Sequence, residues 1–296
     1  MKRIAGFDSD KKLALFFAVT LLWTWAFGMS PVFFGITGTP LGTFLFYFGG
    51  GAPSIVAVVI ILRTWPKSAI RSYFVRCLRF RGPGWKILLF LVLFFAAASA
   101  AAVLFGTALL DSPPPEMAWI KILAARPYMI IPMLLISLIS GPLNEELGWR
   151  GYAQDRLTAR YGLYKGTVIL GLAWGVWHLA WFFTPGQAQH EMAQRSVWEC
   201  AMFFVFVVAQ SFVVSFAYVS TRRSILAGAF AHMMCNFLTS QLLAPFSGPM
   251  RLSVMLSVTV FSIALVVYMI RSRKFKEAYR TAQSDFADDR KRYGSV

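Results

Sequence analysis

The 296-residue sequence is poor in charged residues, and acidic residues are the scarcest of them. Only 14% of the chain is charged, against about a quarter in soluble domains. This shortage argues against a water-soluble domain. Cysteine is also rare: there are three, an odd number, and their spacings match no metal motif. A disulfide framework is therefore not expected.

Apolar residues take the place of the missing charges. They make up 57% of the chain, the mean hydropathy is +0.60, and apolar runs long enough to span a bilayer recur along the sequence. The pattern predicts an all-α fold, a polytopic transmembrane bundle with about eight spans. The expected spans are 13–35, 43–62, 87–110, 127–148, 166–184, 197–219, 224–246 and 252–270.

The basic residues are distributed unevenly between the loops. If the N-terminus is inside, 25 of the 29 Lys and Arg residues fall on that side and four on the other. The positive-inside rule then predicts a cytoplasmic N-terminus and C-terminus in a multi-pass protein of the plasma membrane. The net charge of +16 is explained by anionic membrane lipids as partners, without any nucleic acid. The basic, aromatic 63–86 loop is read as an interfacial segment, with substrate docking as the alternative.

Three regions follow from this layout. Residues 1–126 hold the first transmembrane segments and the basic cytoplasmic loop. Residues 127–246, called the core below, contain the polar and ionisable residues inside the predicted spans. Residues 247–296 hold the last span and a charged cytoplasmic tail. Ionisable groups are costly within a bilayer and mark functional sites by default, so the core is the place to look for chemistry.

The first polar cluster is the sequence Gly-Pro-Leu-Asn-Glu-Glu-Leu-Gly-Trp-Arg-Gly at 141–151. Glu146 and Arg150 are four residues apart, the spacing at which helix side chains meet, so we expect them to pair. Glu145 points elsewhere and is left free. A carboxylate in a dry pocket suits a general base. The structural alternative is a helix end whose charges reach the lipid headgroups.

Histidines supply the other polar groups. His178 lies in an apolar, Trp-rich span, where a lone histidine is more often structural than catalytic. His232 and Asn236 lie on one face of a later span and can both donate hydrogen bonds to a developing oxyanion. Interhelical hydrogen bonding is the simpler explanation for that pair. Each element is weak alone, but together they place a carboxylate, two imidazoles and an amide on three spans.

In this order the motifs resemble the CPBP (ABI) family of intramembrane proteases, which includes type II CAAX prenyl endopeptidases. Its Glu-Glu-x-x-x-Arg motif is complete at 145–150, and its His-x-x-x-Asn motif is complete at 232–236. The intervening Phe-x-x-x-His motif is changed at 174–178 to Trp-Gly-Val-Trp-His. The substitution of one aromatic residue for another puts the shape of the pocket in question more than its chemistry.

The resemblance implies a role for each matched residue. Glu145 would activate water with the help of His178, and His232 and Asn236 would stabilise the oxyanion. Glu146 would be a supporting carboxylate. The implied site is Glu145, Glu146, Arg150, His178, His232 and Asn236. Zinc held by Glu145, His178 and His232 is one expectation, although the His-Glu-x-x-His signature is absent. A metal-free glutamate mechanism is the other.

The leading hypothesis is an intramembrane endopeptidase, of the metallo- or glutamate type. Its substrates would be hydrophobic or lipid-modified peptides, including prenylated CAAX-type ones. We expect the Glu145 end of the fourth span to lie toward the cytoplasm, because the basic 149–165 loop follows it. Two alternatives stay open: a transporter whose buried Glu–His network relays protons, and a non-proteolytic immunity or scaffold protein. No internal repeat of the kind common in transporters is visible.

Overall fold

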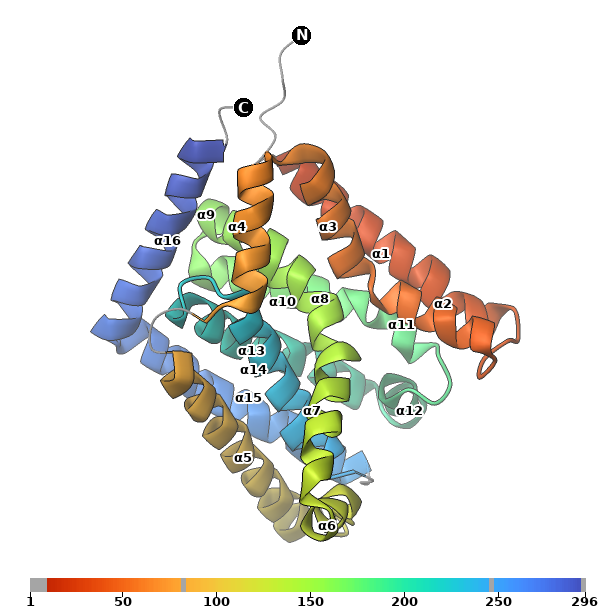
Figure 1. Cartoon of the computed structure of the whole chain (residues 1–296). Helices are drawn as coiled ribbons and strands as arrows, with labels where there is room; N and C mark the ends of the chain where they lie inside the picture. The colour runs from red at the N-terminus through yellow and green to blue at the C-terminus, as the bar shows by residue number, and fades with distance from the viewer. Residues whose placement is uncertain (1–9, 81–83, 245–247, 294–296) are drawn as a thin grey trace.

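The computed structural model describes residues 10–80, 84–244 and 248–293, and within these ranges every regular element is a helix (Figure 1). The predicted all-α class is confirmed. The N-terminal segment, the 63–86 loop, the 224–246 span and the C-terminal tail each include some residues outside these ranges. The elements are α1 (Asp10–Phe33), α2 (Pro40–Gly50), α3 (Ala52–Thr64), α4 (Lys67–Leu78), α5 (Gly84–Leu109), α6 (Ala118–Ala125), the 3-10 turn η1 (Pro127–Met129), α7 (Ile130–Ile139), α8 (Pro142–Gly148), the π-helix η2 (Trp149–Gln154), α9 (Asp155–Tyr161), α10 (Leu163–Trp177), α11 (Leu179–Phe182), α12 (Ala188–Arg195), α13 (Val197–Ser220), α14 (Ile225–Cys235), the π-helix η3 (Asn236–Gln241), α15 (Gly248–Arg271) and α16 (Arg273–Tyr293).

The chain is an integral membrane protein with several apolar helices. Five helical stretches among the described residues are long and apolar enough to cross a bilayer: 10–33, 84–109, 127–161, 197–220 and 248–271. Helices α2 and α3 form a sixth candidate together, bent by 59° at Gly51. The structure therefore supports five of the eight expected spans among the described residues, and a sixth if the bent α2–α3 pair is one span. The orientation of the chain across the membrane stays a prediction.

The other two expected spans, 166–184 and 224–246, coincide with shorter helices. Helix α10 ends at Trp177, and α14 ends at Cys235 where η3 begins. Helix α10 packs on α13, while α14 packs on α13, α8 and α5. Because longer helices surround them, these short helices are enclosed by protein over much of their length. Both carry residues of the predicted site.

The fourth expected span is longer than the sequence suggested. Its apolar run ends near residue 148, yet the helical stretch continues through η2 to Tyr161. Glu145 is 18 residues from the start of this stretch and 16 from its end. At 1.5 Å per residue it is about 25 Å from either end. The helical stretch therefore extends past the predicted end of the span, because the buried polar residues that follow remain helical, and the position of Glu145 toward the cytoplasm stays a prediction.

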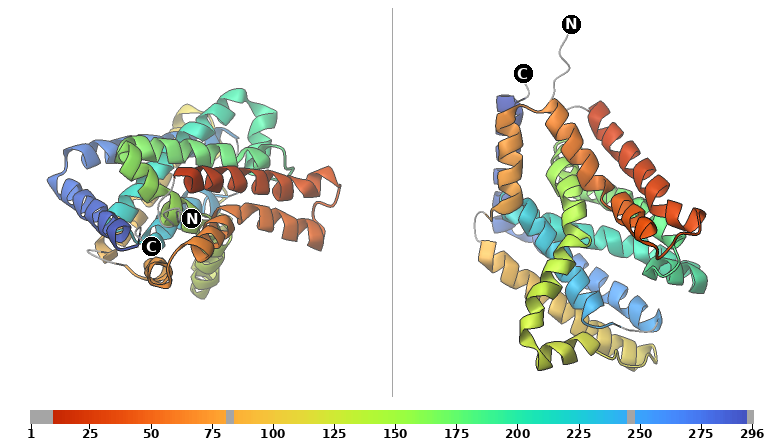
Figure 2. Two further views of the ribbon diagram at one scale, coloured as in Figure 1. Left: turned by 90° about the horizontal axis from the view of Figure 1, so that it is seen from above. Right: turned by 45° about the vertical axis from the view of Figure 1, so that its right-hand side comes forward.

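The basic segments gather at one end of the molecule, where both ends of the described chain lie (Figures 1 and 2). Helices α4, α9 and α16 meet there. The charged tail is helical and is held by two ion pairs, Arg222–Asp285 at 2.8 Å and Arg223–Asp289 at 2.7 Å. Having the basic segments at one end is what the positive-inside distribution requires.

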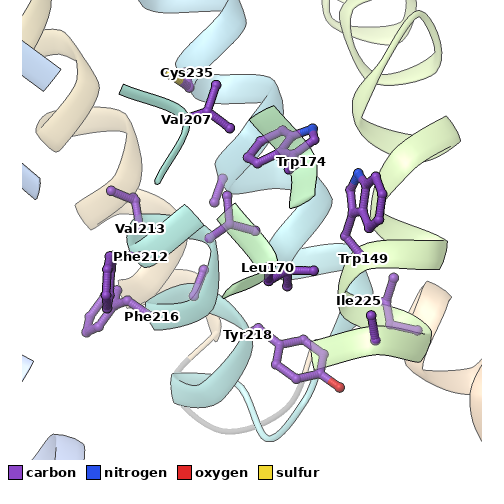
Figure 3. Packing of buried hydrophobic residues seen from close by; sticks show 14 of the residues in the cluster. Trp149, Leu170, Trp174, Val207, Phe212, Val213, Phe216, Tyr218, Ile225 and Cys235 are labelled. Carbon is purple, nitrogen blue, oxygen red and sulfur yellow. The ribbon is translucent and has the colours of Figure 1, made fainter. Parts of the chain in front are cut away.

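A buried aromatic core holds the short helices in register. Figure 3 shows the indoles of Trp149 and Trp174 among the packed apolar side chains at the centre of the molecule. Both tryptophans are almost completely buried. Large aromatic groups dominate core packing, so these rings fix α10 against the α8–η2 segment. This packing positions the polar side chains described next.

Candidate active site

The predicted site residues come together from three short helical segments. Glu145 and Glu146 lie on α8, with Arg150 directly after them in η2. His178 caps the C-terminus of α10. His232 lies in the last turn of α14, and Asn236 begins η3. A π-helix follows the glutamates within a few residues, and a second π-helix follows His232. This local form of helix is frequent at functional sites.

Glu146 lies at the centre of a buried ionic network. Arg150 Nη1 donates to both of its carboxylate oxygens, at 3.0 and 3.1 Å, so the predicted pair is present. The second Arg150 nitrogen, Nη2, donates to Ser211 Oγ at 2.9 Å. His232 Nδ1 is 3.0 Å from Glu146 Oε1. Glu146 and Arg150 are both fully buried, so their charges depend on each other.

Glu145 is held differently from its neighbour. Its Oε2 accepts a hydrogen bond of 2.6 Å from the indole Nε1 of Trp174. The residue is only 6% exposed, and its side chain borders two cavities. No contact with Arg150 within hydrogen-bonding distance is present in the described structure. Glu145 is therefore the carboxylate that is available to a molecule in the cavities.

His178 is oriented by the main chain of its own helix. Its Nδ1 is 2.8 Å from the Trp174 carbonyl oxygen. A carbonyl can only accept, so Nδ1 carries the proton and Nε2 of the neutral ring is free to act as a base. The rings of Trp177 and Phe203 flank the imidazole, with centroids 4.6 and 5.2 Å away. The side chain is thus fixed in both tautomer and direction.

Two cavities meet at these residues, with volumes of about 310 and 580 Å³. Glu145, His178 and Asn236 border both of them, and His232 borders the larger one. Neither Glu146 nor Arg150 borders either cavity. Four of the six predicted residues therefore border a cavity. The other two, Glu146 and Arg150, are buried and lie outside the cavity lining.

Sequence reasoning did not identify three polar groups of the site. Trp174 was noted only as a departure from a motif, and Gln189 was not considered. The third is Gln210, which borders the larger cavity, is buried, and has no hydrogen-bond partner for its Nε2 among the described residues. No signal in the sequence could have identified Gln189, because it lies in a polar connection far along the chain.

The cavities are bordered by the segment 187–192, which connects α11 to α13 through α12. The charge distribution predicts that this segment lies on the side opposite the basic loops. Figure 1 shows α12 away from the end that carries both chain termini.

The predicted zinc ligands do not form a ready-made metal site. Within 10–80, 84–244 and 248–293, no group of three or more His, Cys, Asp or Glu side chains is arranged to hold a metal ion. His232 Nδ1 is directed at Glu146 and His178 Nδ1 at a carbonyl, so the Nε2 atoms are the ring nitrogens left for a ligand. No chemical step is derived through a metal.

Part of the chain also matches a known family. Residues 127–238 match the family model described as type II CAAX prenyl endopeptidase Rce1-like. This segment is similar to that family. The match contains Glu145, Glu146, Arg150, His178, His232 and Asn236, and it lies within the predicted core 127–246.

A curated relative also matches part of the chain. CAAX prenyl protease 2 of Methanococcus maripaludis is 33% identical over 114 residues. The alignment covers 38% of this chain and 41% of the relative. The segment matched by the family model contains the α8, α10 and α14 residues that build the site, while the first helices and α16 lie outside it.

Proposed function

We propose that this protein is an intramembrane endopeptidase that hydrolyses hydrophobic or lipid-modified peptides. The observation that carries the proposal is the meeting of Glu145, His178, His232 and Asn236 around shared open space. Support also comes from the Rce1-like match over the same residues. The site contains a base, a second proton carrier and two hydrogen-bond donors, the groups that peptide hydrolysis needs.

The reaction follows from these groups. Glu145, assisted by His178, takes a proton from water as the water oxygen bonds to the scissile carbonyl carbon. The carbonyl electron pair moves to its oxygen, where His232 Nε2–H and Asn236 Nδ2–H donate to the negative charge. When the C–N bond breaks, the proton held by Glu145 passes to the leaving nitrogen. The products are a carboxylic acid and an amine.

The ionic network suits His232 to its proposed role. A histidine that donates Nδ1–H to Glu146 and Nε2–H to an oxyanion is doubly protonated. With Arg150 it supplies two positive charges against the carboxylates of Glu145 and Glu146. The buried cluster is then neutral as a whole, which is the state that a low-dielectric interior favours.

The lining of the larger cavity favours an apolar substrate. Phe203, Phe206, Val207 and Met255 line it on one side, and the amide of Gln210 is a donor for a peptide carbonyl. Because the relative is a CAAX prenyl protease by name, a prenylated CAAX-type peptide is the first substrate to test. Zinc stays a separate proposal for the same residues.

The test is hydrolysis of a farnesylated CAAX-type peptide by the purified protein in detergent. Glu145→Gln keeps the shape and the acceptor for Trp174 but removes the base, so we expect activity to fall by at least 10²-fold. Glu277→Gln, an exposed carboxamide change on α16, is the matched control and should leave the rate unchanged. If Glu145→Gln hydrolyses the peptide at the wild-type rate, Glu145 is not the base.

Elemental analysis of the same preparation addresses zinc. Stoichiometric zinc that is lost from His178→Ala, together with loss of activity on chelation, would favour the metallopeptidase. Undiminished activity in metal-free protein would favour the glutamate mechanism.

A further inference from the structure

Trp174 occupies the centre of the candidate site. Its indole N–H bonds to Glu145 Oε2 at 2.6 Å, and its ring centroid is 4.9 Å from that of His232. The Arg150 guanidinium carbon is 5.2 Å from the ring centroid on its π face. Trp174 is only 1% exposed, so the ring is confined by its neighbours.

The same residue also holds His178. Trp174 precedes His178 by four positions, and its carbonyl oxygen is 2.8 Å from the imidazole Nδ1. The side chain therefore fixes the carboxylate while the main chain fixes the imidazole. Any aromatic residue at this position would keep the carbonyl contact. Tryptophan adds a ring N–H at the carboxylate, whereas phenylalanine, the usual residue of the resembling motif, has no donor.

We propose that Trp174 is a positioning residue whose indole N–H holds the Glu145 carboxylate in the orientation that activates water beside His178. The proposal rests on the proposed peptidase function. It assigns to the indole nitrogen a task distinct from the packing of the ring.

The physical basis is the directionality of the bond. A hydrogen bond to an ionised carboxylate is short and about twice as strong as a neutral one. With Oε2 held by the indole, Oε1 is the oxygen left to accept from water. Without the indole the carboxylate can rotate within the cavity. Misplacement of a catalytic group by about 1 Å can cost 10²-fold in rate.

The experiment distinguishes the effect of the indole N–H from the effect of the ring's packing. Trp174 is replaced by benzothienylalanine, a bicyclic isostere in which sulfur replaces the N–H, and in a second variant by phenylalanine. We expect the isostere to lower kcat by about 10- to 100-fold with KM unchanged, because the cavity wall keeps its shape. Trp174→Phe should lower kcat at least as much. Trp23→Phe, which removes an indole bond to the Phe48 carbonyl on α2, is the matched control and should leave kcat unchanged.

A spectroscopic measurement tests the contact itself. Of the ten indole N–H signals in a ¹⁵N-labelled sample, the one lost in Trp174→Phe identifies Trp174. We expect this signal to shift in Glu145→Ala and to stay in place in Glu277→Gln. An unshifted signal would show that the contact does not exist and would overturn the proposal.

The outcomes distinguish failure of the role of Trp174 from failure of the proposed peptidase function. An isostere with the wild-type kcat, or with only a raised KM, overturns the role of the N–H and leaves the peptidase intact. A wild-type protein that cleaves no peptide overturns the function and the role together, whether or not the indole signal shifts.

Discussion

Arg150 shows how much a single buried charge depends on its partners. It is fully buried and bonded to Glu146 and Ser211. In Arg150→Ala, the buried Glu146 carboxylate loses both hydrogen bonds from the guanidinium and keeps only the contact with His232. Breaking a buried pair by removing one partner costs about 3–5 kcal/mol. We therefore expect a clear fall in the thermal unfolding midpoint in detergent, together with loss of activity.

A surface pair provides the comparison. In the Arg222–Asp285 pair the two side chains are 47% and 25% exposed, so water replaces either partner when the other is lost. Arg222→Ala should cost no more than about 1 kcal/mol. If both variants unfold at the same temperature, the ionic network around Glu146 contributes nothing special to stability.

The sequence predicted the Glu146–Arg150 pair because its partners are one helical turn apart. It could not predict the contacts of Glu146 with His232 or of Glu145 with Trp174, which lie 86 and 29 residues apart. Those contacts depend on how α8, α10 and α14 pack. Local spacing reveals pairs within a helix, whereas the tertiary arrangement alone decides which helices face each other.

At the scale of elements, the close approach of α8 to α3 sets the position of the glutamates. Gly148 lies against the backbone carbonyl of Pro53, and a Cβ at Gly148 would collide with that carbonyl. Because a backbone group cannot rotate aside, Gly148→Ala must push the two helices apart. We expect a lower unfolding temperature and a reduced kcat, since Glu145 and Glu146 move with α8.

Gly228→Ala is the matched control for this change. Gly228 lies in the middle of α14, and a Cβ there would meet side-chain atoms at 3.4 Å, an ordinary contact. Alanine also favours a helix over glycine by about 1 kcal/mol. Gly228→Ala should therefore fold at least as stably as the wild type. Equal destabilisation of both variants would contradict the importance of the α3–α8 contact.

Helix existence could largely be predicted from hydropathy, but helix boundaries could not. The apolar run ends near residue 148, whereas the helix continues to Tyr161 because Arg150 and Asp155 find partners inside the protein. Conversely, α10 and α14 are shorter than expected from their apolar runs. A hydropathy pattern reports the free energy of transferring side chains from water to lipid. It contains no information on polar groups whose hydrogen bonds are made with neighbouring helices.

At the scale of the whole molecule, helix α12, which borders the cavities, lies away from the end where the basic segments gather. Gln189 borders both cavities from α12, while α16 lies at the end with the basic segments (Figure 1). If the basic end is cytoplasmic, as the positive-inside rule predicts, the cavities face outward. A substrate would then reach Glu145 from the outer side or laterally from the bilayer.

The reactivity of introduced cysteines tests on which side of the membrane the cavities lie. In a variant with the three native cysteines changed to serine, we expect Gln189→Cys to react with a membrane-impermeant maleimide on intact cells. Lys276→Cys, exposed on α16 at the basic end, should react only after permeabilisation. A bulky adduct at residue 189 should also block peptide hydrolysis, since that side chain borders the space around Glu145. The reverse labelling pattern would show that the predicted orientation in the membrane is wrong. If the protein labelled at residue 189 still hydrolyses the peptide, substrates reach Glu145 by another path.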